Sequence, residues 1–148
     1  MWRELVESVC SDCKFAAPAS EQSLNEAEAA IGVALPPELR ALLLESNGIE
    51  DIFGDGVFSA ECILSRNLEM RDLVAEDNTY MSFDSLLCFG SVGDGDLFFF
   101  PVQGNGKVNN PDIFIWNHES DSRKLIAGNL EKFVKQWYSG QLDDTGDG

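Results

Sequence analysis

Residues 31–48 read IGVALPPELRALLLESNG, and this stretch predicts the first sharply bounded element of the fold. A residue that precedes proline avoids the helical region, so Leu35 and Pro36 are expected to be extended. Pro37 suits the first position of a helix, where its missing N–H costs no hydrogen bond. Leucines at helical spacing follow, and Gly48 permits a left-handed exit. The stretch therefore predicts a short amphipathic helix whose core-facing side chains are Leu39, Leu42 and Leu43.

Two further helices are predicted before this stretch. Ser20 can cap a helix that ends at Gly32 and whose apolar face is formed by Leu24, Ala27 and Ile31. Upstream of it, apolar residues three to four apart predict a helix over residues 2–15, which would carry Trp2, Leu5, Val9 and Cys13 on one face. The first third of the chain is therefore expected to be helical.

After Gly48 the pattern becomes that of strands. Strands are expected over residues 57–64, 86–89, 97–102, 112–116 and 124–126, with a short helix over 66–74. The continuous apolar run LFFFPV at 97–102 indicates burial on both faces, and Pro101 marks the end of that strand. Its pairing with 112–116 is predicted to be a hairpin with a long loop. Asn129 can cap a last helix, whose stripe is Leu130, Phe133, Val134 and Trp137.

Helices, then strands, then a helix is the order of an α+β protein rather than of an alternating parallel sheet. We predict a single domain over residues 1–142, with a mostly antiparallel sheet covered by the N-terminal and C-terminal helices. Residues 143–148 are acidic and lack apolar side chains, so they are expected to form a disordered tail.

The charge excludes several classes of partner. The 148 residues include 26 acidic and 10 basic ones, for a net charge of −16. Binding to nucleic acid through a phosphate-neutralising surface and attraction to anionic membranes are therefore not expected. Neither a signal peptide nor an apolar run of about 20 residues is present, which leads us to expect a soluble cytoplasmic protein.

No catalytic group, metal or cofactor is expected. Cys10 and Cys13 form one C-x-x-C, but a zinc site needs two such pairs or added histidines, and His118 is the only histidine. The four cysteines are therefore predicted to be reduced, buried or half-buried thiols. His118, near a strand end, is expected to be a surface or edge histidine rather than a catalytic base. The glycine-rich residues 91–96 (SVGDGD) match neither a phosphate loop nor a calcium loop and predict a tight turn.

The negative charge is concentrated in the middle of the chain. Residues 45–96 hold 12 acidic and two basic side chains, whereas residues 97–142 hold four and five. Loops carried by a rigid sheet are frequent binding sites, and an acidic set complements a basic partner. The candidate contacts are Glu50, Asp51, Asp55, Asp94 and Asp96. The alternative is that these loops are simply solvated.

Several ordered motifs resemble the SUKH superfamily (Smi/Knr type). Residues 28–40 (EAAIGVALPPELR), followed by Ser46-Asn47-Gly48, resemble its opening signature. Residues 87–100 (LCFGSVGDGDLFFF) resemble its strand–glycine–strand turn, 112–118 its next strand and 127–134 (AGNLEKFV) its closing helix. The resemblance covers roughly residues 20–140.

This resemblance implies an α+β fold and a non-enzymatic, protein-binding role. Many bacterial members are immunity proteins that neutralise polymorphic or contact-dependent toxins, often nucleases or deaminases. Others are named for a fungal regulator of cell-wall synthesis. The resemblance therefore leads us to expect a protein that neutralises a cognate toxin. A regulatory adaptor of cell-wall synthesis or signalling, which binds an endogenous protein, is the alternative. No binding residue carries over from the family.

Overall fold

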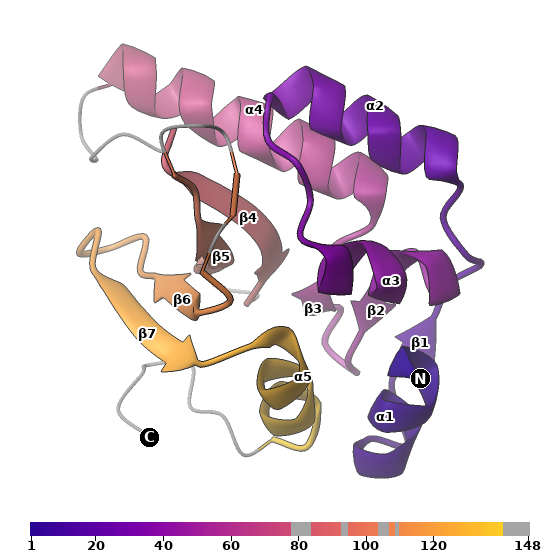
Figure 1. Cartoon of the computed structure of the whole chain (residues 1–148). Helices are drawn as coiled ribbons and strands as arrows, with labels where there is room; N and C mark the ends of the chain where they lie inside the picture. The colour runs from indigo at the N-terminus through magenta and orange to yellow at the C-terminus, as the bar shows by residue number, and fades with distance from the viewer. Residues whose placement is uncertain (78–83, 93–94, 104–106, 109, 141–148) are drawn as a thin grey trace.

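The computed structural model describes the chain except residues 78–83, 93–94, 104–106, 109 and 141–148, and is shown in Figure 1. Asp94 and the predicted tail lie outside the described residues. Within them the chain forms five helices and seven strands. In chain order these are α1 Trp2–Val9, β1 Lys14–Phe15, α2 Glu21–Ile31, α3 Pro37–Glu45, β2 Ile49–Glu50, β3 Gly56–Val57, α4 Ala60–Asp77, β4 Leu86–Ser91, β5 Leu97–Pro101, β6 Ile113–Trp116, β7 Arg123–Ala127 and α5 Leu130–Tyr138.

The seven strands form one sheet in the order β1 to β7, and every neighbouring pair is antiparallel. This confirms the predicted α+β class, the antiparallel sheet and the β5–β6 hairpin. In Figure 1, α2 lies alongside α4 at the top, α1 and α5 lie together at the bottom, and α3 lies between α2 and α1. Each strand pairs with the strand that comes next in the chain, so successive connections alternate between the two ends of the sheet.

Both faces of the central strands are buried, as the LFFFPV run predicted. Phe98 and Phe100 point into the main core, which is shared with the helices. The alternate residues Leu97 and Phe99 belong to a smaller cluster on the other face, with Met70 of α4. Since successive side chains of a strand point to opposite faces, this division follows directly from the strand's period of two.

The stretch that opened the sequence analysis forms the predicted helix, but the helix ends at Glu45 with an extended Ser46, and the positive φ of Gly48, 94°, lies beyond its end rather than at its cap. Pro37 occupies the first turn of α3, and the three leucines at its core face are fully buried. Before it, the Ser20 hydroxyl accepts a hydrogen bond from the Ser23 N–H at 3.0 Å and caps α2, which Gly32 ends at a φ of 79°. Local capping chemistry therefore determines both ends of α2, whereas α3 begins at a proline in its first turn and has no side-chain cap.

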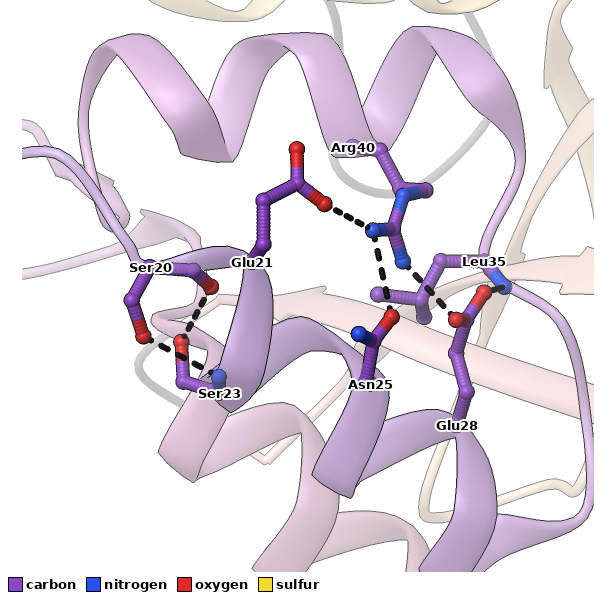
Figure 2. Close-up of polar contacts among 7 residues, drawn as sticks. All are labelled: Ser20, Glu21, Ser23, Asn25, Glu28, Leu35 and Arg40. Carbon is purple, nitrogen blue, oxygen red and sulfur yellow. Dashed lines mark hydrogen bonds and ion pairs between the residues drawn. The ribbon is translucent and has the colours of Figure 1, made fainter.

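A carboxylate on α2 ties this helix to the start of α3 (Figure 2). The Glu28 carboxylate accepts a hydrogen bond from the Leu35 N–H at 2.7 Å and binds the Arg40 guanidinium at 2.8 Å. Arg40 also reaches Glu21 at 2.6 Å. Leu35 is buried, so its N–H needs a partner inside the protein. The glutamate of the opening signature therefore satisfies the backbone of its Leu-Pro step.

Residues 57–64 contradict the prediction of a strand. Only Gly56–Val57 pairs in the sheet, and α4 begins at Ala60 and absorbs the helix predicted over 66–74. The Ala60 N–H donates to the Asn47 side-chain oxygen at 2.8 Å, and the Cys62 N–H donates to the Ser59 hydroxyl at 3.1 Å. Asn47, which supplies part of this cap, lies thirteen residues before Ala60. The local pattern of residues 57–64 therefore could not show that a helix begins there.

The N-terminal segment also differs from the prediction. Helix α1 ends at Val9 rather than at residue 15, and the chain turns at Cys10 into β1. Cys10 and Cys13 form a disulfide, with Cα atoms 5.9 Å apart. The expectation that all four thiols are reduced is therefore wrong for this pair, whereas Cys62 and Cys88 are free. The apolar spacing did not show that the helix stops before Cys13, and the resulting turn brings the two sulfur atoms together.

Candidate functional site

Three hairpin turns project from one end of the sheet, beyond the ends of its strands. One residue of each strand lies in a row that crosses the whole sheet, each residue paired with the next. The turns 51–55, 92–96 and 117–122 all lie on the same side of that row. The row consists of Lys14, Glu50, Gly56, Ser91, Leu97, Trp116 and Arg123. We call this row and its three turns the acidic end. Its described carboxylates are Glu50, Asp51, Asp55, Asp96, Glu119 and Asp121.

The turn 51–55 is closed by its own aspartate. One Asp51 carboxylate oxygen accepts hydrogen bonds from the Phe53 N–H at 2.8 Å and the Asp55 N–H at 3.0 Å. The Asp51 N–H in turn donates to the Asp55 carbonyl at 2.8 Å, and Gly54 supplies a φ of 83°. Aspartate and glycine favour such turns because one bonds the local backbone and the other tolerates a positive φ. The turn is therefore a defined structure.

The last helix fixes the base of this hairpin. The Tyr138 hydroxyl donates to the Ile49 carbonyl at 2.7 Å and accepts from the Val57 N–H at 2.9 Å. Burial raises the pKa of Tyr138 far above its ordinary value, so the hydroxyl keeps its proton. A Cβ at Gly56 would meet this hydroxyl and would lie 2.6 Å from the Ile49 carbonyl. Only glycine fits there, and α5 thereby holds β2 and β3 in place.

Asp96 is not a surface carboxylate, and this corrects its assignment as a direct partner contact. The residue is only 4% exposed. Its carboxylate lies 2.7 Å from the His118 Nδ1 and accepts the His118 N–H at 3.0 Å. Buried polar groups need partners within the protein, and the neighbouring turn supplies them. Asp96 therefore joins the turn 92–96 to the turn 117–122, in which His118 follows β6 and packs against the Asp96 carboxylate with its side chain 35% exposed.

The turn 117–122 adds carboxylates that the sequence analysis did not assign to the site. The Asn117 side-chain oxygen accepts from the Glu119 and Ser120 N–H groups at 2.9 and 3.1 Å. The Glu119 side chain is 82% exposed. Asp121 instead turns inward, where the Trp116 indole N–H donates to it at 2.6 Å. The sequence could have assigned Glu119 to the site only through the rule that alternate turns of an antiparallel meander lie at the same end of the sheet.

A recess of about 540 Å³, lined by both polar and apolar side chains, opens beside the first of these turns. Its lining includes Glu50 and Gly54 from the hairpin, Lys14 from β1, and Arg66 from α4. Lys14 also stands directly opposite Glu50 in the sheet. A partner that covers the turn 51–55 would therefore meet two cations at its margin, so the charge of the acidic end is patterned rather than uniform.

The site presents exposed carboxylates, chiefly those of Glu50 and Glu119. Among the described residues, no group of three or more His, Cys, Asp or Glu side chains could hold a metal ion. Nor does any helix in this part of the chain combine the length and apolar character needed to cross a membrane. The candidate residues Glu50, Asp51 and Asp55 lie together on the β2–β3 hairpin, which the sequence analysis did not predict, and Glu119 lies at the same end of the sheet.

A comparison with protein families agrees with this architecture. The model of the SMI1 / KNR4 family (SUKH-1) matches residues 18–136. None of the curated proteins with which the chain was compared matches it. The matched range begins just before α2 and runs into α5, so it includes all three turns of the acidic end. The chain therefore belongs to the SMI1 / KNR4 family (SUKH-1).

Proposed function

We propose that this chain is a cytoplasmic immunity-type protein, which binds a cognate protein toxin through the acidic end and thereby neutralises it. The observation that carries the proposal is that three turns meet at one end of the sheet. This end carries the carboxylates of Glu50, Asp51, Asp55 and Glu119. Family membership supports a protein-binding role in general.

The mechanism is occlusion rather than catalysis. A nuclease or deaminase that acts on nucleic acid presents basic side chains to its substrate's phosphates. An acidic end of defined geometry complements such a surface and accelerates the encounter, because opposite charges steer two proteins together. Once bound, the acidic end excludes the substrate from that surface. The net charge of −16 extends the same attraction beyond the contact itself.

The test first asks whether a toxin gene lies immediately upstream of this chain's gene, and then whether the chain rescues bacteria that express that toxin. We expect the wild-type chain to restore growth and the double variant Glu50→Lys/Glu119→Lys to restore it poorly. Both residues are exposed, so the fold tolerates the change. The matched control is Glu26→Lys/Glu38→Lys, which changes the net charge equally at exposed positions of α2 and α3.

Equal protection by both double variants would exclude the acidic end as the binding site. No protection by the wild-type chain against that toxin would exclude the immunity function. In that case, stable binding of the purified chain to an endogenous protein of cell-wall synthesis would support the regulatory adaptor instead.

A further inference from the structure

Two apolar side chains stand at the tip of the turn 51–55, inside the acidic end. Phe53 is 80% exposed and Ile52 is 63% exposed. Every other phenylalanine that the structure describes is buried or half-buried. Exposing an aromatic ring and a neighbouring aliphatic chain to water is unfavourable by roughly 25 cal/mol per Å² of apolar surface. Packing within this molecule therefore does not account for the exposed positions of Phe53 and Ile52.

The hairpin holds these two side chains outward. The Asp51 carboxylate binds the Phe53 N–H itself, and the Asp51 N–H and Asp55 carbonyl close the turn. Below the turn, Tyr138 bonds both β2 and β3 from the core. A loop without these bonds could fold the ring back against the protein. Here the backbone under Phe53 is already ordered, so a partner pays little conformational entropy to bind it.

Charge surrounds this apolar tip on its own hairpin. Glu50 is exposed, and Asp51 and Asp55 are half-buried on either side of Ile52 and Phe53. Protein interfaces combine an apolar centre with a charged or polar rim, and aromatic residues are frequent at the centre. The complementary surface is therefore an apolar pocket ringed by lysine and arginine side chains.

We propose that Phe53, supported by Ile52, is the anchor by which this chain binds its protein partner, and that the partner presents an apolar pocket with a basic rim. The inference rests on the proposed function and specifies how the acidic end achieves affinity. The carboxylates attract and orient the partner, and burial of the ring retains it. Insertion into an anionic membrane would require three carboxylates to approach lipid headgroups of the same sign, which charge repulsion opposes.

The experiment uses titration calorimetry to measure binding to a catalytically inactive form of the toxin against which the wild-type chain is tested in the rescue assay. We expect Phe53→Ala to weaken binding by roughly 30-fold or more, which is the range of an interface hot spot. The control is Leu73→Ala, which truncates an exposed apolar side chain on α4, about 20 Å along the helix from Ala60. Its affinity is expected to stay within about twofold of the wild type.

Each outcome separates this inference from the function on which it rests. If the wild type binds and protects while Phe53→Ala binds equally well, the anchor is wrong and the immunity function stands. If the wild type neither binds nor protects, the immunity function fails and the anchor fails with it. Binding of the wild type, but not of Phe53→Ala, to anionic phospholipid vesicles would assign the tip to a membrane and overturn the inference. Thermal unfolding of each variant checks that the fold is intact.

Discussion

At the scale of the residue, Cys88 shows how a local irregularity is stabilised. The register of β4 and β5 shifts between Cys88 and Gly90, so Cys88 lies next to a bulge. Asn67 of α4 compensates: its side-chain oxygen accepts from the Cys88 N–H at 2.9 Å, and its amide donates to the Cys88 carbonyl at 2.8 Å. The thiol itself is completely buried, and burial raises its pKa from 9.0 to about 12.

This raised pKa predicts a loss of stability in alkaline solution. Above about pH 9 the thiol ionises in the unfolded chain but stays protonated in the folded protein up to about pH 12. The unfolded state then binds fewer protons, so the free energy of unfolding decreases as pH rises, by at most about 1.4 kcal/mol per pH unit from this group. Below pH 9 the group contributes no pH dependence. Urea denaturation at pH 8 to 11 measures the effect.

The control for this prediction is Cys88→Ala, which removes the titrating thiol and leaves the contributions of Tyr138 and Cys62 unchanged. The stability difference between wild type and variant is expected to shrink from pH 9 upward. A difference that stays constant from pH 8 to 11 would contradict the assignment.

At the scale of the element, the junction of α2 and α3 depends on one carboxylate. Glu28 provides an acceptor for the buried Leu35 N–H and a charge for Arg40. Its side chain is 23% exposed, so both interactions are partly shielded from water. The Leu35-Pro36 step keeps the chain extended between the helices, and that leaves the Leu35 N–H without a helical partner.

We therefore expect Glu28→Ala to lower the free energy of unfolding by about 1–3 kcal/mol, since it leaves a buried backbone donor without a partner. Glu28→Gln keeps an acceptor for Leu35 and is expected to cost less. The matched control is Glu21→Ala, which removes the more exposed partner of Arg40 and should cost at most about 1 kcal/mol. Urea denaturation of the three variants checks this order, and equal losses for all three would contradict it.

At the scale of the whole molecule, charge and apolar contact are predicted to act on different rates. The net charge of −16 is felt at a distance, whereas the Phe53 ring acts only on contact. Long-range attraction is screened by salt, with a Debye length of about 10 Å at 0.1 M and about 3 Å at 1 M. Short-range burial is not screened in this way.

The rate of association with the toxin is therefore expected to fall by about tenfold or more between 50 and 500 mM NaCl. The dissociation rate should change little, and stopped-flow kinetics separates the two. The double variant Glu50→Lys/Glu119→Lys is expected to show a weaker dependence on salt. An association rate that is independent of salt would mean that the acidic end does not steer the encounter.

The sequence by itself determined the features that depend on neighbours along the chain. Ser20, Gly32, Pro37 and Asn129 mark helix boundaries through capping and backbone chemistry, and each acts where predicted. The run at 97–100 indicated a strand buried on both faces. The predicted strand at 57–64 failed because Asn47, from outside the segment, caps the N-terminus of α4.

Only the tertiary structure decided which acidic residues form a surface. Composition placed Asp51 and Asp96 in the same class, yet one orders an exposed turn and the other is buried against His118. Glu119 joined the acidic end because the strand order places the turns 51–55 and 117–122 at the same end of the sheet, and the Phe53 side chain, on the first of these turns, stays exposed to solvent. The three turns meet there only because β3 pairs with β4 across the 18-residue helix α4, and a pairing across an intervening helix depends on tertiary contacts that residues close in the sequence do not encode.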